Sequence, residues 1–371
     1  MAAKKVILVQ LYSNGDCLYA TTVAKQIKKD YPGSHLTWAI SSKFKTILAN
    51  NPDVDEVLEV NSVEKNHAPA FRRFKREIYQ QQKEGLYDEV FIVHNTDINH
   101  AYYDGSIRSS ILKAYRKPIT VSVQPVLRLY PEEVERANQF ADAKDLKNYK
   151  EVVLFEYAPQ SGQSNISPDF AIKVAEGIVA QNNFAVILSS ANKINHPNKA
   201  IIDGSSLTLR ETAALSHHCS FLLGSSSGIT WITTSEAGKQ LPMVQLLDAH
   251  TKWVNPISRD FERFHIPNNK VIELLDFNEV KTIECVKLAL ENFEGAKQKF
   301  NQPIPLHFRT TRNIVYNLLV YFEFGAILKH IKVNREVYGD SISFYKEVVM
   351  GFITAPFRLI KNLIAKRRNN R

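Results

Sequence analysis

Short apolar runs alternate with segments of helical spacing along most of this chain. The unbroken run KVILVQL (5–11) has the length of a strand buried on both faces, and residues 18–31 then repeat apolar positions every three to four residues, as an amphipathic helix does. The same order recurs, with strands expected at 35–40, 56–60, 89–93 and 119–123 and helices at 42–49, 66–84 and 106–116. This alternation predicts a doubly wound sheet of parallel strands.

A polar connection at 125–150 separates this series from a second one. Its strands are expected at 151–155, 184–190, 220–224 and 242–247, and its helices at 168–181, 208–217, 228–238 and 279–299. We therefore predict an α/β protein with two facing Rossmann-like domains, residues 1–145 and 146–300. The natural ligand site of such a pair is the cleft between the carboxyl ends of the strands.

Residues 301–371 differ in kind. They hold twelve Lys and Arg against four Asp and Glu, a net charge of +8 out of +9 for the whole chain. Because the rest is nearly neutral, a basic cleft for nucleic acid is not expected. Segments 313–331 and 344–371 are amphipathic and aromatic, which is typical of helices that lie on a membrane surface or dock on the protein.

We expect both, with the earlier segment docking and the later one binding an anionic membrane surface. The cations that would hold it there are Arg358, Lys361, Lys366, Arg367, Arg368 and Arg371.

The remaining composition narrows the class of protein. Hydrophobic residues at 44% and charged residues at 23% are values of a globular chain. The cysteines, Cys17, Cys219 and Cys285, follow neither a disulfide nor a metal pattern, which favours a reducing compartment. We expect a cytoplasmic protein, peripherally attached to the inner face of the cytoplasmic membrane, with no metal site and no cofactor.

Two turns carry candidate chemistry. The first, Tyr12 to Asp16, follows the first strand and places Asp16 at the mouth of the cleft; this aspartate is either a catalytic group or the cap of a helix that begins at Cys17. The second holds two glycines and three serines before a helix, which suits a diphosphate cradle but also a simple capped connector. Its residues are Gly224, Ser225, Ser226, Ser227 and Gly228.

The segments around both turns resemble glycosyltransferase family 9, the heptosyltransferases of lipopolysaccharide assembly. Residues 8–32 share the family's strand, Gly-Asp turn and helix ending at Tyr-Pro, and NPDVDEV (51–57) matches its "NPxVDEV" run. Residues 206–247 resemble the signature "SLRELAALLxxADLxVGxDSGxxHLAAAxGxPVVxLF". The similarity covers about residues 4–250 in order and spacing.

This resemblance implies a GT-B fold and an inverting, metal-independent transfer of a sugar from a nucleotide-diphospho-sugar. Asp16 matches the family's catalytic base, which deprotonates the acceptor hydroxyl. The loop 224–228 matches the segment that binds the donor diphosphate. The acceptor would be a glycan or glycolipid of the bacterial cell surface.

Three departures from the family pattern concern the donor. Ser226 and Trp231 stand where the family has Asp and His, and QSGQSNI (160–166) replaces a lysine-containing loop. Donor binding is then expected from backbone and hydroxyl groups, or from Lys193. Trp231 either stacks on a base or sugar or, as is more common for a helix aromatic, is buried in the protein. The departures point away from ADP-heptose itself as donor.

Acceptor contacts are expected from the first domain. They would come from the turn beside Asp16, from the basic helix, whose guanidinium groups suit phosphorylated sugars, and from the helix that opens at 106. The residues are Asn14, Gly15, Arg72, Arg73, Arg76, Ser106 and Arg108, with Ser109 as a further candidate. A solvated helix face explains the arginines nearly as well.

Two other functions remain open. A catalytically weak or inactive GT-B relative, acting as a sugar-binding or assembly subunit at the membrane, would explain the missing Asp, His and Lys. A sugar-nucleotide epimerase of the same fold fits less well, because the basic tail would have no purpose there.

Overall fold

A computed structural model of the chain describes residues 3–65, 67–157, 166–180, 183–248, 256–304 and 307–369, and of residues 97 and 361–369 the backbone alone. The N-terminal half holds a parallel sheet in the order β3-β2-β1-β4. Its strands are β1 (Lys5–Val9), β2 (His35–Ile40), β3 (Glu56–Glu59) and β4 (Glu89–Ile92), and its helical segments are α1 (Asn14–Asp30), η1 (Ser42–Leu48), α2 (Ala68–Lys83), η2 (Asp97–Tyr102) and α3 (Ile107–Ala114).

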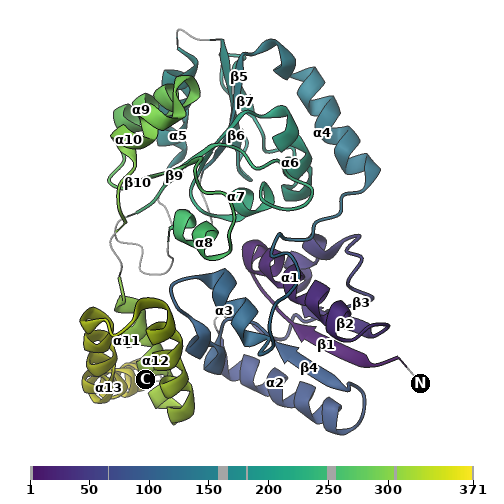
Figure 1. Cartoon of the computed structure of the whole chain (residues 1–371), viewed down its shortest axis with the longest axis vertical. Helices are drawn as coiled ribbons and strands as arrows, with labels where there is room; N and C mark the ends of the chain where they lie inside the picture. Colours follow the sequence, from purple (N-terminus) through teal and green to yellow (C-terminus); the bar gives the residue numbers. More distant parts are fainter. Residues whose placement is uncertain are drawn as a thin grey trace.

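The C-terminal half holds a second parallel sheet, in the order β10-β9-β8-β5-β6-β7. Its strands are β5 (Glu151–Glu156), β6 (Phe184–Ser189), β7 (Ile201–Asp203), β8 (Phe221–Gly224), β9 (Met243–Leu246) and β10 (Val271–Leu274). Its helices are α5 (Pro168–Val179), α6 (Leu209–Leu215), α7 (Gly228–Ile232), α8 (Ile257–Arg263), α9 (Glu279–Glu291) and α10 (Phe293–Phe300). Figure 1 shows the two halves one above the other, with α7 and α8 facing α1 and α3. The expected pair of Rossmann-like halves is confirmed.

Residues 119–123, which are all described, form no strand, so that prediction was wrong. The backbone N–H groups of Thr120 and Val121 donate to Oε1 of Gln26 on α1, at 2.7 and 3.1 Å, and this side chain takes the place of a strand partner. The segment therefore runs along α1, and β4 is left as an edge of its sheet.

The connection at 125–150 is more ordered than its polar sequence suggests, since it contains helix α4 (Pro131–Ala143). Pro131 occupies the first turn, where its missing N–H is harmless, and the Glu133 carboxylate accepts a hydrogen bond from the Tyr130 N–H at 2.8 Å. Glu133 also accepts from Arg210 of α6 at 2.7 Å, and Arg210 donates to the carbonyl of Ala49 at 3.1 Å. This buried arginine joins the connection to both halves.

The tail forms three helices, α11 (Arg309–Val320), α12 (Phe324–Tyr338) and α13 (Ile342–Asn369). The single helix expected at 313–331 is interrupted at Phe322, whose φ of 58° is left-handed. The three helices pack around one another and around Tyr103 of the N-terminal half, beside which they lie in Figure 1. Within the described residues, no helix is both long and apolar enough to cross a bilayer.

Candidate functional site

The first turn brings Asp16 to the edge of the sheet that faces the other half. Helix α1 begins at Asn14 with Ser13 as its N-cap residue, so Asp16 lies inside the first turn and the capping alternative was wrong. In the part of the chain that is described, the Asp16 carboxyl group forms no hydrogen bond or ion pair. Burial raises the pKa of this carboxyl to about 7, against a smaller lowering by the charge of Lys65.

Sequence reasoning missed three polar side chains near this turn. Tyr12, Lys65 and His94 follow β1, β3 and β4, whose carboxyl ends share one sheet edge. Burial lowers the pKa of His94 to about 3, with further lowering by the charges of His100 and Lys65, so its imidazole is neutral at neutral pH. Its ring lies 5.5 Å from that of Tyr12, and the buried Nδ1 of His94 and hydroxyl of Tyr12 have no hydrogen-bond partner within the described chain. Polar residues directly after each strand were the signal available in the sequence.

The second turn is organised by Glu156, which sequence reasoning also missed. This buried residue ends β5, and its carboxylate accepts hydrogen bonds from the backbone N–H groups of Ser225 and Ile229, at 3.3 and 2.9 Å. It also accepts from the hydroxyls of Ser227 and Thr230. A protein carboxylate thus occupies the position at this loop where a ligand phosphate was expected.

The loop has few donors left for a ligand. The Ser226 N–H donates to Oε1 of Gln245 at 2.6 Å, and Ser226 takes a left-handed φ of 57°. At Gly224, an added Cβ would lie 2.8 Å from Nε2 of Gln245, so a larger residue there would require the Gln245 side chain to shift. Within the described chain, the N–H groups of Ser227 and Gly228 at the start of α7 donate to no protein group.

Lys193, the other expected donor contact, is exposed beyond the end of β6. Of the loop 160–166, all but Ile166 lies outside the described residues. The donor-binding role of Lys193 and of residues 224–228 therefore stays a prediction.

Trp231 and Arg108 lie between the two halves. Trp231 is buried, with its ring 5.0 Å from that of Tyr19 on α1 and its Cδ1 3.3 Å from where a Gly15 Cβ would stand. The Arg108 guanidinium lies 4.7 Å from the Tyr19 ring and 5.4 Å from the Trp231 ring. Its Nε is 3.2 Å from the Asp260 carboxylate, but neither Nη atom has a hydrogen-bond partner in the described part of the molecule. Aromatic and charged side chains therefore close the cleft beside the Gly15-Asp16 turn.

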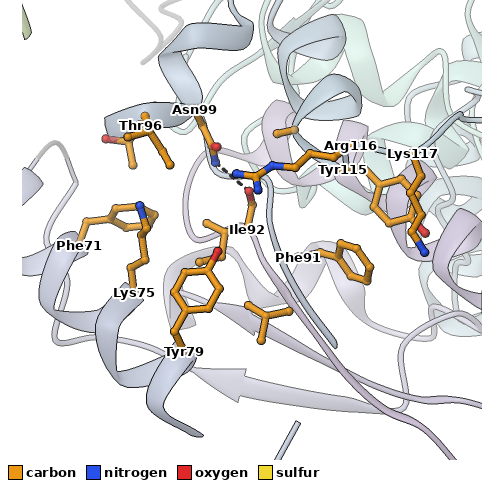
Figure 2. Close-up of a pocket in the computed structure, with 13 residues that line it drawn as sticks. Phe71, Lys75, Tyr79, Phe91, Ile92, Thr96, Asn99, Tyr115, Arg116 and Lys117 are labelled. Atoms are coloured by element: carbon orange, nitrogen blue, oxygen red, sulfur yellow. Dashed lines mark hydrogen bonds between the residues drawn. The ribbon is translucent and has the colours of Figure 1, made fainter. Parts of the chain in front are cut away.

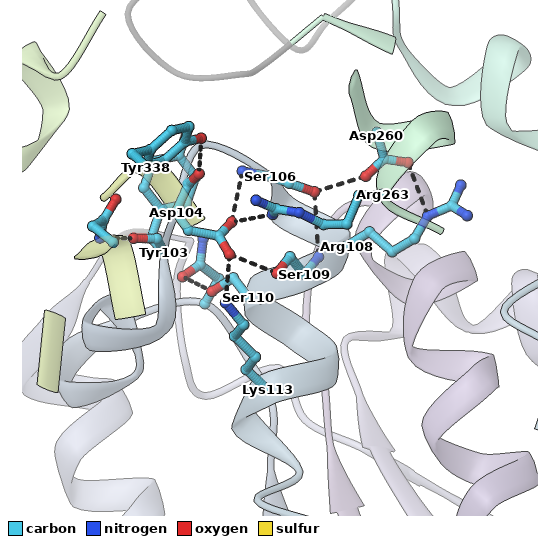
Figure 3. Close-up of polar contacts among 12 residues, drawn as sticks. Tyr103, Asp104, Ser106, Arg108, Ser109, Ser110, Lys113, Asp260, Arg263 and Tyr338 are labelled. Carbon is cyan, nitrogen blue, oxygen red and sulfur yellow. Dashed lines mark hydrogen bonds and ion pairs between the residues drawn. The ribbon is translucent and has the colours of Figure 1, made fainter. Parts of the chain in front are cut away.

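A buried aspartate, Asp104, links the contact between the two halves to the C-terminal tail. Figure 3 shows its carboxylate between Ser109 and Lys113 of α3, each 2.7 Å away, and Arg263 of α8, at 2.8 Å. Its backbone carbonyl accepts a hydrogen bond from the hydroxyl of Tyr338 on α12. Both halves and the tail thus meet at one residue.

The expected acceptor residues are dispersed. Ser106 is buried and donates to Asp260 at 2.7 Å, so it lies with Arg108 in the contact between the halves. Arg72 stacks on the ring of Tyr321 in the tail, 3.3 Å from its centroid, while two arginines of α2 face solvent. Asn14 and Gly15 lie beside Asp16, and Arg73 and Arg76 are exposed. The acceptor role of the expected residues stays a prediction.

Among the described residues, no group of three or more His, Cys, Asp or Glu side chains could hold a metal ion. The three thiols are buried, and burial raises the pKa of each. They are therefore not thiolates at neutral pH.

No model of a known protein family matches the sequence, and no curated protein matches it either. Among solved structures, the chain is similar to the glycosyl transferase family 9 protein from Veillonella parvula DSM 2008, with a TM-score of 0.52 and 15% identity over 81% of this chain and 90% of that one. It is also similar to the ADP-heptose lps heptosyltransferase II of E. coli, with a TM-score of 0.53 and 12% identity over 78% of this chain and 99% of that one.

The likeness extends over both halves and nearly the whole length of the two solved structures. At these identities it concerns the fold, and it agrees with the motifs around the two turns. The chain therefore has the GT-B fold of glycosyltransferase family 9, as its sequence predicted.

Proposed function

We propose that this chain is an inverting, metal-independent glycosyltransferase that moves a sugar from a nucleotide-diphospho-sugar to a glycan or glycolipid of the bacterial cell surface. The observation that carries the proposal is the carboxyl group of Asp16. It lies in the turn that matches the family's catalytic turn, has no protein partner in the described chain, and has a pKa of about 7. A general base works best when its pKa is near the operating pH.

In this reaction the Asp16 carboxylate accepts the proton of an acceptor hydroxyl. The oxygen attacks the anomeric carbon of the donor from the face opposite the diphosphate, and the bond from that carbon to the diphosphate oxygen breaks. The nucleoside diphosphate leaves with the bonding electron pair, and the configuration at the anomeric carbon is inverted. Asp16 needs no covalent bond to the sugar in this scheme.

The leaving diphosphate requires positive charge or donated hydrogen bonds. The N–H groups of Ser227 and Gly228 at the start of α7 and the buried hydroxyl of Ser225 are loop donors that the protein leaves unused in its described part. Lys193 supplies a cation from the neighbouring loop, beyond β6. Trp231 has to move away from Gly15 for a donor sugar to reach Asp16, because the two are in contact.

The test is Asp16→Asn, assayed by nucleoside diphosphate release and by product analysis, with a panel of sugar nucleotides and a bacterial glycolipid extract. We expect transfer to fall by about 10²–10⁴-fold while the nucleotide still binds, because only the proton acceptor is removed. The control is Asp53→Asn, a second aspartate whose pKa burial raises. Wild-type transfer by Asp16→Asn would exclude Asp16 as the base.

The exposed face of α13 supports attachment to an anionic membrane, from the cytoplasmic side. Phe344 and Val348 are buried against the protein, while Val349, Phe352 and Phe357 are exposed. After Glu347 the sequence holds six Lys and Arg and no acidic residue. Exposed apolar rings next to cations are typical of helices that lie in a bilayer interface.

Membrane attachment is tested with Phe352→Glu/Phe357→Glu, which leaves the buried side of α13 unchanged. We expect wild type to sediment with vesicles containing phosphatidylglycerol and the double variant to stay in solution. Val280→Glu is a matched control, because Val280 on α9 is 67% exposed and Phe357 is 71% exposed. Equal sedimentation of the double variant and wild type would refute the attachment.

A second function, a sugar-binding or assembly subunit without transfer activity, is favoured by two observations. The carboxylate of Glu156 occupies the donor loop, and Trp231 fills the space beside Gly15. Binding of a sugar nucleotide without release of nucleoside diphosphate, with every donor and acceptor tried, would select this function. Release with any pair would exclude it.

A further inference from the structure

A pocket of about 220 Å³ opens along β4, the strand that the missing fifth strand leaves as a sheet edge. We call it the edge pocket. Its walls come from α2, from η2 and from the end of α3, and its floor is β4, as Figure 2 shows. The lining residues are Phe71, Lys75, Tyr79, Val90, Phe91, Ile92, Thr96, Ile98, Asn99, Ala114, Tyr115, Arg116 and Lys117.

The size of the edge pocket limits its ligand to about one ring. Sites for drug-sized molecules measure about 300–1,000 Å³, and this pocket is smaller. Four aromatic side chains contribute to the wall, which gives flat apolar surfaces for a ring. The hydroxyls of Tyr79 and Thr96 form no hydrogen bond within the described chain, so a ligand with hydroxyl groups finds partners there. A sugar ring, with apolar faces and polar edges, matches both features.

The charge of the edge pocket is positive. Lys75 comes from α2, and Arg116 and Lys117 follow α3, while no acidic residue is among the described lining residues. Lys117 already interacts with Tyr31, whose hydroxyl accepts its hydrogen bond. Arg116 is exposed, and its guanidinium group forms no hydrogen bond or ion pair with any described residue. Figure 2 shows its side chain reaching across the pocket toward Ile92, opposite Lys75.

The backbone at Arg116 is unfavourable for arginine. Its φ of 64° lies in the left-handed region, at the end of a helix where glycine is the usual residue. A residue with a Cβ costs about 1 kcal/mol there, so this site carries a guanidinium at the expense of stability. Backbone strain of this kind is common at positions where the side chain has a function.

A row of rings joins the edge pocket to the Asp16 turn. Phe71 lines the pocket, and its ring centroid lies 5.2 Å from that of His94, which in turn lies 5.5 Å from that of Tyr12. The two sites are therefore neighbours with separate linings.

We propose that the edge pocket binds a single sugar ring that carries a phosphate or carboxylate group, with Arg116 as the principal contact to the anion. A guanidinium group binds either anion through two parallel hydrogen bonds, and the aromatic walls hold the ring. This site is additional to the proposed transfer at Asp16 and does not depend on it.

The test is Arg116→Gly, which removes the guanidinium and relieves the left-handed strain, so the variant folds at least as well as wild type. Calorimetric titration is carried out with glucose 6-phosphate, glucuronate, glucose and inorganic phosphate. We expect wild type to bind both charged sugars more tightly than glucose or phosphate, and Arg116→Gly to weaken that binding at least tenfold. Lys83→Ala, an exposed cation of α2 outside the pocket, should leave it unchanged.

Three outcomes would overturn the proposal. The first is no binding of either charged sugar to wild type up to about 10 mM. The second is equal binding of phosphate and glucose 6-phosphate, which would leave the ring without a role. The third is binding that Arg116→Gly leaves intact and Asp16→Asn removes, which would place the ligand at the Asp16 turn instead.

Discussion

The two strand-to-helix turns that follow β1 and β8 have opposite electrostatic arrangements. In the first, the Asp16 carboxyl has no protein partner in the described chain, and burial raises its pKa to about 7. In the second, the Glu156 carboxylate accepts hydrogen bonds from the backbone N–H groups of Ser225 and Ile229 and from two hydroxyls. One turn holds a group ready to accept a proton, and the other uses its donors within the protein.

The same strand-to-helix motif can therefore leave its polar groups without a protein partner or pair them within the protein. A Gly-rich loop before a helix suggests anion binding, yet here an internal anion already binds it. A diphosphate bound at this loop would have the N–H groups of Ser227 and Gly228 and the unpartnered hydroxyl of Ser225 as donors, close to the Glu156 carboxylate. The first turn, by contrast, needs no rearrangement of its own hydrogen bonds to act as a base.

Removing the internal anion should have the largest effect. Glu156→Ala leaves two backbone N–H groups and two hydroxyls without their acceptor, and we expect it to lower the free energy of unfolding by about 3 kcal/mol, or Tm by roughly 10 °C. Thermal unfolding measures this. Glu151→Ala, at the other end of β5, is the control and should change stability by less than about 0.5 kcal/mol. An equal loss of stability in Glu156→Ala and Glu151→Ala would show that the second turn does not depend on the Glu156 carboxylate.

The pH dependence of transfer tests the first turn. Only the carboxylate form of Asp16 accepts a proton, so kcat/KM should be constant above pH 7 and fall about tenfold per unit below it. The measurement is kcat/KM between about pH 5 and pH 9. Asp53→Asn should keep the same profile. A profile that bends only near the ordinary aspartate pKa of about 4 would show that Asp16 is not the titrating base.

A third variant, Glu156→Gln, tests how the charge of Glu156 affects the binding of a diphosphate at the second turn. Glu156→Gln keeps the size of the side chain but ends its repulsion of a bound diphosphate, so we expect a nucleoside diphosphate to bind about tenfold more tightly. Calorimetric titration with ADP and UDP measures this, with Glu151→Gln as control. Weaker or unchanged binding to Glu156→Gln would place the diphosphate away from the loop at 224–228.

The smallest effect concerns the stability of the first turn. Asp16 has a folded-state pKa of about 7, while the ordinary aspartate pKa is 3.8, so its ionisation destabilises the fold progressively as the pH rises between these values. Asp16→Asn should therefore be more stable than wild type above pH 7, and the gain should vanish below about pH 4. Urea unfolding at pH 8 and pH 4 measures it. A less stable variant at pH 8 would mean that the carboxylate has a stabilising partner.

Hydrophobic patterning alone located eight of the strands, β1 to β6, β8 and β9, near enough to place the site. The run at 5–11 led to β1 and the turn with Asp16, and SFLLG led to β8 and the loop at 224. Continuous apolar runs determine such strands because both faces of a parallel sheet are buried. The order of the two turns along the chain then placed them at facing sheet edges.

Two parts of the fold were not predictable in this way. Residues 119–123 look like a strand, but the side chain of Gln26 binds two of their N–H groups. The edge pocket lies along β4, the strand that is left at the edge of the sheet. Pairing between residues about 95 positions apart in sequence is decided by tertiary packing, which a local pattern does not contain.

The pattern of apolar runs and turns was sufficient to predict two facing Rossmann-like halves with Asp16 at the edge between them. The chemical state of the two turns depends on the folded structure. Asp16 acquires its raised pKa because neighbouring segments remove water from it, and the loop at 224–228 donates to a protein carboxylate because Glu156 ends an adjacent strand. Burial and hydrogen bonding depend on which distant residues come together, and those contacts form only when the chain is folded.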